Sequence, residues 1–305
     1  DGVNNNAAAS NTYTWTYDTT APIITVGTAA GDGYVSKDEY ATNGFAVVGM
    51  VNADANGQTV TVDYGGASST CTAGSGTYSC TFSAGVLAAA NSGSGISDGS
   101  IAITADVDDA AGNSATTAHG SAIQDTVDPT MVITSNTVAS GASTTTAAIV
   151  LIYTASEAST ATSNFVIGDI TVTNCNNAAF TTASSTVYGS TCTVTADSTP
   201  TVLVAAEAFT DTAANGNGAA SNTYTWTQDD TGPTMTITSN TIASGGTTAT
   251  AAVVLIYTSN EATANFAEVD ITETNCNTGT FTVTSTTVYG STCTVTADST
   301  PTVLV

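Results

Sequence analysis

Carboxylates are the side chains of this 305-residue chain with the most chemistry to offer. The sequence contains 25 Asp and Glu residues but a single Lys or Arg, Lys37, and its formal net charge is −24. With so few basic partners, the repulsion between carboxylates must be relieved by solvent, salt or bound cations, so a divalent metal ion is expected before any motif is considered. Nucleic acids and anionic membrane surfaces attract clusters of Lys and Arg. Both are therefore excluded as partners.

The sequence offers no set of residues for catalysis. His119 is the only histidine, and it lies in a segment rich in Gly, Ser and Thr, where a solvated residue is expected rather than a general base. Without a second His, a reactive Cys or an Arg, neither a catalytic triad nor a zinc site can be assembled. Adjacent carboxylates such as Asp108 and Asp109 could act on glycosides, but nothing indicates a sugar cleft around them. We expect a protein that is not an enzyme.

The six cysteines fall into three close pairs, which are Cys71 with Cys80, Cys175 with Cys192, and Cys276 with Cys293. The first pair brackets "TAGSGTYS", a hairpin signal, and a two-residue turn at 75–76 makes Cys71 and Cys80 a facing pair within reach of a disulfide. The other two pairs share a spacing of 17 residues, and each bridge would stabilise by about 3 kcal/mol. Thiolate metal sites need clusters of the CxxC type, which are absent. We predict three disulfides and an oxidising, extracellular setting.

No apolar run is long enough to cross a membrane. The longest, "AAIVLIY" at 147–153, has the length of a strand and falls far below the roughly 20 residues of a spanning helix. The chain does not begin with Met and shows no signal peptide. We therefore expect a mature or excerpted segment without membrane insertion.

Internal repeats divide the chain. The 19 residues "TVYGSTCTVTADSTPTVLV" at 186–204 recur without change at 287–305. "PTMVITSNTVASG" begins at Pro129 and "PTMTITSNTIASG" at Pro233, while "DTTAP" ends at Pro22. These periods of about one hundred residues indicate tandem domains. We predict boundaries at 22–128, 129–232 and 233–305, with 1–21 as the last strand of a preceding or neighbouring domain and the 233–305 domain lacking its last strand.

Each repeat is expected to be made of β-strands. "TAAIVLIYT" and "TAAVVLIYT" are short β-branched runs, and "STCTVTAD", "TYTWTYD" and "QTVTVDYGG" alternate apolar with polar residues. Turn residues interrupt these runs every eight to twelve positions, and no helical periodicity persists. This spacing is typical of a two-sheet sandwich. Trp15 and Trp226 alternate with Tyr13 and Tyr224 on expected last strands, where we predict core packing, with sugar stacking as the alternative.

Several motifs give the chain a family resemblance. "DTTAP" before a β-rich stretch, "TASEAST" with "GDITVTN", "FTDTAANGNGAASNTYTWTQDDTGP" and "ADVDDAAGNSAT" resemble the bacterial Ig-like tandem repeats of large secreted adhesins and biofilm proteins. The resemblance covers nearly the whole chain. It implies an all-β fold of Ig-like sandwiches in a stiff extended array, often with Ca²⁺ at domain junctions. The paired cysteines and the near-absence of Lys are not typical of that family.

Carboxylates gather at the expected junctions, where their hard oxygen atoms suit Ca²⁺. The candidate ligands at these places are Asp18, Asp106, Asp108, Asp109, Asn113, Asp125, Asp128, Asp211, Asp229 and Asp230. The family resemblance adds Glu157, Asp169, Glu261 and Asp270, which occupy positions near a junction in such repeats. The alternative is that Asp and Asn simply form turns here. "GDGYVSKDE" at 31–39 imitates half an EF-hand, but Thr28 and Ala30 stand where two carboxylates are required, so an EF-hand is not predicted.

The segment "SNTYTWT" occurs at 10–16 and again at 221–227, where it closes a repeat. The order of the repeat segments along the chain is therefore that of a cyclic permutation of three whole repeats. Two interpretations remain open: the flanking part-domains continue into neighbouring repeats of a longer array, or the first strand of one copy completes the last domain of the next. We predict a structural extracellular protein, a cell-surface stalk or filament whose partners are copies of itself or neighbouring repeats head-to-tail. A carbohydrate- or receptor-binding adhesive module is the alternative, with surface glycans as partners.

Overall fold

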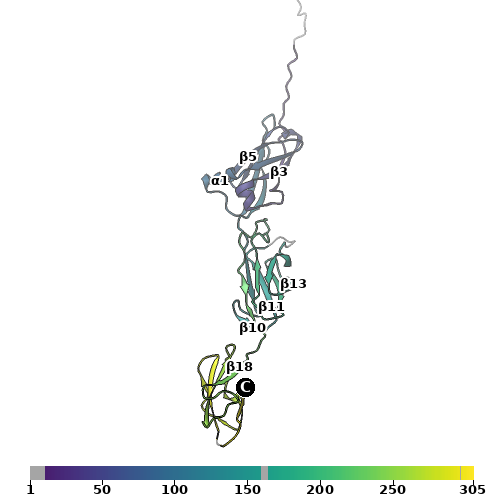
Figure 1. The fold of residues 1–305 in the computed structure, drawn as a ribbon. Coiled ribbons are helices and arrows are strands. Elements are labelled where there is room, and N and C mark those ends of the chain that lie inside the picture. The colour runs from purple at the N-terminus through teal and green to yellow at the C-terminus, as the bar shows by residue number, and fades with distance from the viewer. Residues whose placement is uncertain (1–10, 159–163, 296) are drawn as a thin grey trace, which may run out of the picture. The chain divides into compact units, whose positions relative to one another are not determined.

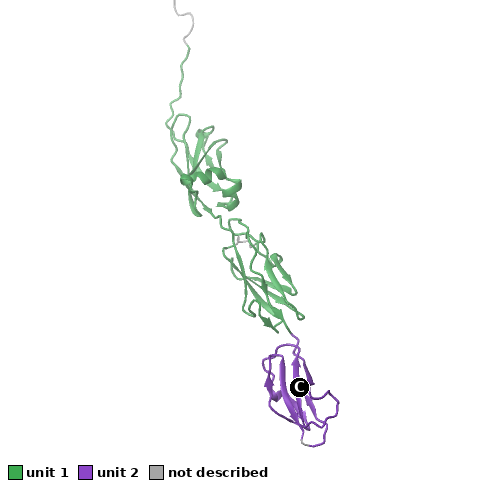
Figure 2. Ribbon diagram, turned by 60° about the vertical axis from the view of Figure 1, so that its left-hand side comes forward, with its two compact units in different colours: residues 1–229 green, residues 230–305 purple. Residues whose placement is uncertain are grey.

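The computed structural model describes residues 11–158, 164–295 and 297–305, and these fall into two compact units. The first unit is Asp1–Asp229 and the second is Asp230–Val305 (Figure 2). The first unit contains two separate hydrophobic cores, one built from residues between Ile24 and Ala122 and the other from residues between Met131 and Trp226. We call the parts around these cores the first sandwich and the second sandwich. The predicted all-β class is confirmed, because strands dominate all three parts (Figure 1).

The first sandwich encloses its core between two sheets. One sheet has the order β1-β3-β6, and the other has the order β2-β8-β7-β4-β5. All pairs are antiparallel except β2 with β8. Alternate residues of β3 and β6 are buried, as the alternating sequence predicts. The strands are β1 (Ile24–Ala29), β2 (Tyr34–Val35), β3 (Phe45–Val51), β4 (Thr59–Tyr64), β5 (Ala67–Thr72), β6 (Thr77–Phe82), β7 (Gly99–Val107) and β8 (Ala118–Gln124).

Short helices in the first sandwich were not expected from the sequence. Helix α1 (Ala84–Gly93) buries Leu87 and Ala90 against the core, and Ala90 to Ser92 already leave helical geometry. Its Ala-rich run has high helix propensity, but the run is too short and too weakly periodic to be recognised as a helix from the sequence. Two further single turns are η1 (Glu39–Asn43) and η2 (Ala53–Ala55).

The second sandwich repeats the two-sheet plan with different strand lengths. One sheet has the order β13-β14-β11-β9 and the other the order β12-β15-β16, while β10 pairs with β17 in parallel. Its elements are β9 (Met131–Ser135), β10 (Ser143–Thr144), β11 (Ala148–Ala155), η3 (Ile167–Asp169), β12 (Ile170–Thr173), β13 (Asn176–Thr182), β14 (Val187–Thr193), β15 (Thr201–Val204), β16 (Tyr224–Thr225) and β17 (Thr227–Gln228).

Among its described residues, the second unit contains counterparts of β9, β11, β12, β13, β14 and β15. Its larger sheet has the order β18-β19-β23-β21, with β22 also paired to β23, and its smaller sheet holds only β20 and β24. The elements are β18 (Met235–Ser239), β19 (Ala252–Ser259), η4 (Glu268–Asp270), β20 (Thr272–Thr274), β21 (Asn277–Thr278), β22 (Thr282–Val283), β23 (Val288–Thr294) and β24 (Thr302–Leu304).

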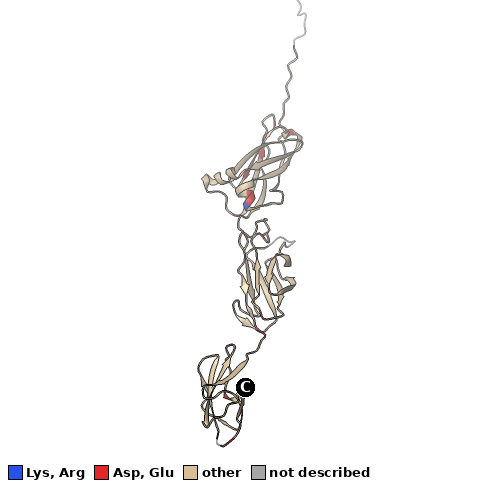
Figure 3. Ribbon diagram, viewed as in Figure 1, with Lys and Arg blue, Asp and Glu red and all other residues tan. Residues whose placement is uncertain are grey.

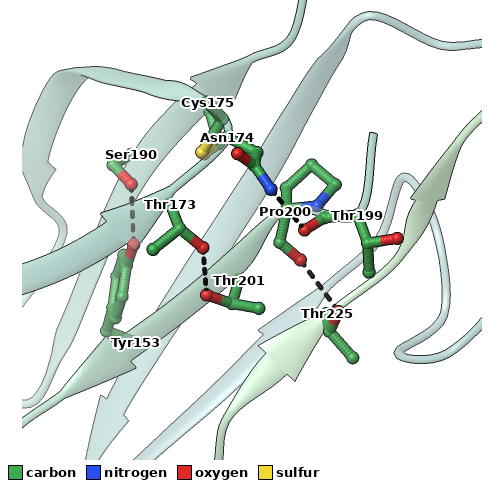
Figure 4. The surroundings of a disulfide bond; sticks show 10 residues. Tyr153, Thr173, Asn174, Cys175, Ser190, Thr199, Pro200, Thr201 and Thr225 are labelled. Atoms are coloured by element: carbon green, nitrogen blue, oxygen red, sulfur yellow. Dashed lines mark hydrogen bonds between the residues drawn. A yellow bond between two sulfur atoms is a disulfide. The ribbon is translucent and has the colours of Figure 1, made fainter. Parts of the chain in front are cut away.

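All six cysteines are paired as disulfides, in the three combinations expected from the sequence. The predicted hairpin ladder around the first bridge is wrong, however. Gly74 and Thr77 do pair across the turn, but β5 then joins β4 while β6 joins β3 in the opposite sheet. The Cys71–Cys80 bridge therefore links the two sheets of the sandwich instead of two neighbours in one sheet. Figure 4 shows the surroundings of the second bridge, with Asn174, Thr199 and Pro200 nearby.

The predicted strand at "TYTWTYD" is also absent from the first unit. Residues 11–20 belong to no strand and are exposed, with Tyr13 82%, Trp15 77% and Tyr17 84% accessible. The predicted core packing therefore fails for Trp15 and holds for Trp226, which is 1% exposed. A strand forms only where a neighbouring strand offers backbone partners, and none of the strands described in the first unit pairs with this segment.

Candidate functional site

The joint between the first and second sandwiches is the best-defined site in the first unit. Only residues 125–130 separate β8 from β9. The side chain of Asn215 spans this joint: its Nδ2 donates to the carbonyl of Asp125 at 2.9 Å, and its Oδ1 accepts from the Lys37 amide at 2.7 Å. The Lys37 ammonium contacts Asp128 at 2.6 Å, and this hydrogen bond raises the pKa of Lys37. Figure 3 marks this single basic residue in blue beside acidic residues in red.

A tight turn holds Asn215 in place. Asp211 is 1% exposed, and its two oxygens accept hydrogen bonds from the Asn215 amide and from Asn215 Nδ2, each at 2.9 Å. A carboxylate that aims an amide side chain in this way removes most of its freedom, so its contact with the linker is preorganised.

The first sandwich contains the same turn. Asp109 accepts hydrogen bonds from the amide and Nδ2 of Asn113, each at 2.8 Å, and Asn113 Nδ2 also donates to the Asp18 carbonyl at 3.2 Å. The Asn113 side chain is the main reason that the pKa of Asp109 is lowered. Asp109 and Asn113, which were both predicted as metal ligands, are joined in the structure by the hydrogen bonds of this turn. Asn215 was missed, although aligning "DAAGN" with "DTAAN" would have revealed it.

Three predicted ligands come together at the joint. One carboxylate oxygen from each of Asp125, Glu157 and Asp211 lies within 4.8 Å of the others, the only such group of three among the residues the structure describes. Asp125 belongs to the linker, Glu157 follows β11, and Asp211 lies in the buried turn. Burial is the largest cause that raises the pKa of both Asp125 and Glu157, and the neighbouring carboxylates raise it further. Three converging hard oxygens fit a divalent ion such as Ca²⁺.

Asp98 contributes to this site and was not anticipated. Its carboxylate accepts hydrogen bonds from the amide and hydroxyl of Thr126 at 3.0–3.1 Å, which orders the linker next to Asp125. Its charge is also one of the causes that raise the pKa of Asp125 and Glu157. No spacing in the sequence points to Asp98, because it reaches the linker only through the packing of β7 against β8.

The remaining predicted ligands lie apart from this group in the described parts of the chain. Asp106 accepts a hydrogen bond from Thr117, and Asp128 contacts Lys37. Asp169 and Asp270 accept the amides of Val166 and Ala267, so each closes a single helical turn. The others are neither in that group of three nor in a second one: Asp18, Asp108, Asp229, Asp230 and Glu261.

Two further segments were judged from the sequence. His119 is an exposed residue near the start of β8. In the EF-hand-like segment at 31–39, the Asp32 carboxylate accepts a hydrogen bond from the Tyr34 amide. The Glu39 carboxylate accepts hydrogen bonds from the amide and hydroxyl of Ser36, so both carboxylates stabilise turns. Over the described residues, no helix has both the length and the apolar character needed to cross a membrane.

No family model and no curated protein matches this chain. Solved structures do match. A structure of a 1.5-MDa bacterial ice-binding adhesin is 19% identical over 89% of this chain and 86% of its own, with a TM-score of 0.44. An immunoglobulin-like domain of the M. primoryensis ice-binding adhesin is 27% identical, covering 35% of this chain and 99% of its own, with a TM-score of 0.25. Invasin, a bacterial integrin-binding protein, is 14% identical over 92% of this chain and 56% of its own, with a TM-score of 0.36. These proteins belong to the class that the sequence motifs resemble.

Proposed function

We propose that this chain is a structural part of an extracellular protein, in which tandem Ig-like sandwiches form a cell-surface stalk or filament that serves adhesion or a biofilm. The observation that carries this proposal is the joint at residues 125–130. Asn215 contacts both the Asp125 carbonyl and the Lys37 amide, so two independently cored sandwiches are held by directional bonds on either side of a short linker. Such a joint resists bending, which is what an extender needs.

The extracellular setting is supported by covalent chemistry. All six cysteines form disulfides, which persist in oxidising compartments. With Lys37 as the only Lys or Arg, the chain offers a trypsin-like protease a single site. Both properties suit a protein that remains outside the cell.

We also propose that Ca²⁺ binds Asp125, Glu157 and Asp211. The ion would neutralise three carboxylates, two of which, Asp125 and Asp211, contribute to the raised pKa of Glu157, and it would tie the linker to the second sandwich. Because Asp211 also positions Asn215, metal binding and the bond that spans the joint would reinforce each other.

A binding module for carbohydrates or a receptor is the second candidate. Tyr13 and Trp15 are exposed aromatic residues whose ring centres lie 6.0 Å apart, and exposed aromatic faces can stack on sugars. A glycan array probed with the whole chain and with Trp15→Ser tests this candidate, which predicts a signal that the variant loses.

Small-angle X-ray scattering of the dilute whole chain tests the structural role. A stalk requires rod-like scattering, and Asn215→Ala should broaden the distribution of interatomic distances because it frees the joint. Asn56→Ala is the matched control, since the Asn56 side chain accepts the Gly76 amide within the first sandwich alone. Scattering from a compact particle, or equal flexibility of the wild type and Asn215→Ala, would contradict a stiff stalk.

A further inference from the structure

The side chain that spans the joint belongs to a chemically unstable pair of residues. Asn215 is followed by Gly216, and an Asn that precedes a Gly is the Asn that loses its side-chain amide most readily. Glycine has no side chain to shield its backbone nitrogen, and its backbone is the most permissive. That nitrogen can therefore attack the neighbouring Asn side chain. The joint thus depends on an amide that can be converted to an acid.

The conversion needs no reactant other than water. The Gly216 nitrogen loses its proton to solvent and attacks Cγ of Asn215, and the bond between Cγ and Nδ2 breaks, with ammonia as the leaving group. Water then adds to the resulting cyclic imide and opens it. The chain has lost ammonia and gained water, and position 215 carries a carboxylate on a normal or an iso-aspartyl backbone. Because the first step begins with loss of a proton, its rate rises with pH.

The closed joint opposes this reaction by holding the Asn215 side chain. Its Nδ2 donates to the Asp125 carbonyl and to Asp211, each at 2.9 Å, and its Oδ1 accepts the Lys37 amide at 2.7 Å. Asn215 is 5% exposed, so water has little access to it. The side chain must give up these bonds before Cγ can turn toward the Gly216 nitrogen. Closure of the joint therefore protects the amide.

A second pair of the same kind, two residues further on, is protected differently. Asn217 is fully buried and also precedes a glycine, Gly218. Its side chain bonds to backbone atoms within residues 205–219, which form its own loop. The Asn215 side chain bonds instead to the linker and to the first sandwich. Only the protection of Asn215 should therefore depend on whether the joint is closed.

Packing favours glycine after Asn215. A Cβ added at Gly216 would lie 2.2 Å from Oε2 of Glu207, so the Glu207 carboxylate would have to move to admit any other residue. Asn215 is itself needed for the bonds that cross the joint. These two structural requirements together place the reactive pair at the joint.

The product cannot make the bonds that the amide made. A carboxylate at position 215 has no hydrogen to donate, so the contacts with the Asp125 carbonyl and with Asp211 would become contacts between oxygen atoms. It would also add a negative charge beside Asp125, Glu157 and Asp211, whose oxygens lie within 4.8 Å of one another. Like charges so close together repel. Without a cation, a joint that contains the product should stay open.

We propose that Asn215 is a site of spontaneous deamidation controlled by the joint: the closed joint protects the amide, and opening exposes it to a conversion that prevents reclosure. This inference rests on the structural role proposed above, and it adds a route by which a stalk loses stiffness irreversibly. The fraction of converted chains should rise with the total time that the joint has spent open.

Mass spectrometry of the aged whole chain tests the protection. The chain is incubated with chelator at mildly alkaline pH, and conversion of Asn215 is followed in chymotryptic peptides by the mass change from amide to acid. Asp98→Ala frees the linker by removing its bonds to Thr126, and it should speed the conversion about fivefold. Asp63→Ala is the matched control, since Asp63 accepts the Gly66 amide within the first sandwich alone. This control should convert at the wild-type rate.

Asn217 supplies an internal comparison in every sample. Its bonds lie within its own loop, so Asp98→Ala should leave its conversion unchanged while that of Asn215 rises. Unfolding the chain in urea should let both residues convert rapidly. The proposal is overturned if Asn215 converts no faster in Asp98→Ala than in the wild type, or if conversion of Asn217 rises by the same factor. An Asn215 that stays intact in urea would also overturn it.

Asn215→Asp tests the consequence of conversion. In small-angle X-ray scattering with chelator, this variant should show the same broadened distribution of interatomic distances as Asn215→Ala. Asn56→Asp is the matched control, because it makes the same chemical change where the side chain accepts the Gly76 amide within the first sandwich. Wild-type scattering from Asn215→Asp would mean that the joint tolerates the product, and it would overturn the irreversible loss of stiffness.

Failure here is distinguishable from failure of the structural role. Scattering from the wild type reports whether the chain is rod-like, whereas mass spectrometry reports whether Asn215 reacts. A rod-like wild type whose Asn215 does not respond to Asp98→Ala would leave the stalk and remove its control of deamidation. A flexible or compact wild type would contradict the stalk, whatever the rate of conversion.

Discussion

The second sandwich and the second unit share most of their strands, yet they bury them differently. The stretch "TVYGSTCTVTADSTPTVLV" is identical in both, and several local contacts recur. The Tyr153 and Ser190 hydroxyls are 2.9 Å apart, and those of Tyr257 and Ser291 are 2.8 Å apart. The apolar residues at the edge differ, since Val204 is fully buried and Val305 is 45% exposed. Identical sequences can therefore fold to the same local structure while their burial depends on the strands that lie beside them.

A second pair of identical segments leads to the same conclusion. "SNTYTWT" is part of a closed sandwich at 221–227, where Trp226 is 1% exposed, whereas Trp15 in the other copy is 77% exposed. A tryptophan contributes to stability through the apolar area that it removes from water, so the size of this contribution depends on the residues that pack around it. The comparison yields predictions of decreasing size.

Replacing Trp226 with Ala should have the largest effect. Removal of a fully buried tryptophan costs about 3–5 kcal/mol of unfolding free energy. Trp15→Ala should change the unfolding of the monomeric first unit by less than about 0.5 kcal/mol, because an exposed side chain loses little. Urea unfolding of the dilute chain measures both, with the transition of the second sandwich resolved by limited proteolysis. Similar losses in the two variants would contradict the difference in burial.

Removing one disulfide at a time compares the second sandwich and the second unit directly. Cys175→Ala with Cys192→Ala, and Cys276→Ala with Cys293→Ala, each open a loop of the same length, so each should cost about 3 kcal/mol. The second unit begins with fewer buried apolar residues, so the same loss should abolish its resistance to chymotrypsin while the second sandwich stays folded. If the second sandwich were digested first, the second unit would not be the weaker region.

The joint and the Asp109 turn differ in their response to pH. Raised pKa values at Asp125 and Glu157 mean that the folded chain holds protons to higher pH than the unfolded chain. Without metal, this site's contribution to stability should therefore fall as pH rises from the ordinary values of 3.8 and 4.5 through the raised ones. The lowered pKa of Asp109 acts in the opposite sense: its contribution is present above 3.8 and is lost as pH falls through the lowered value.

Calcium should offset the loss of stability that Asp125 and Glu157 cause at the joint as pH rises. At one hundred times its dissociation constant, a ligand of the folded state stabilises by about 2.7 kcal/mol, and Glu157→Gln should lose most of this increment. Glu268→Gln is the control, since it makes the same charge change at an exposed residue of the second unit. Thermal unfolding at pH 4 and pH 7, with calcium and with chelator, measures the effect. An equal calcium response in wild type and Glu157→Gln would contradict the proposed ligands.

Part of the candidate site could be predicted from sequence and part could not. Asp125, Glu157 and Asp211 were among the predicted ligands, but so were Asp106, Asp169 and Asp270, which instead accept nearby hydrogen bonds. Composition and the spacing of the motifs indicate that carboxylates gather near a junction, but they do not indicate which carboxylates lie together in one site. Asp98 and Asn215 reach the linker through contacts between segments far apart in the chain.

The sequence by itself determined the β-rich class, the repeats and the pairing of cysteines. These features are local: alternation with a period of two places residues on the two faces of a strand, and short separations bring cysteines within reach. Only the tertiary structure decided that Cys71 and Cys80 lie in opposite sheets, that Lys37 meets Asn215 across 178 positions, and that one "SNTYTWT" is buried while the other is exposed. Each of these depends on which strand lies next to which, and backbone pairing between distant strands is a property of the assembled sheets rather than of any one segment.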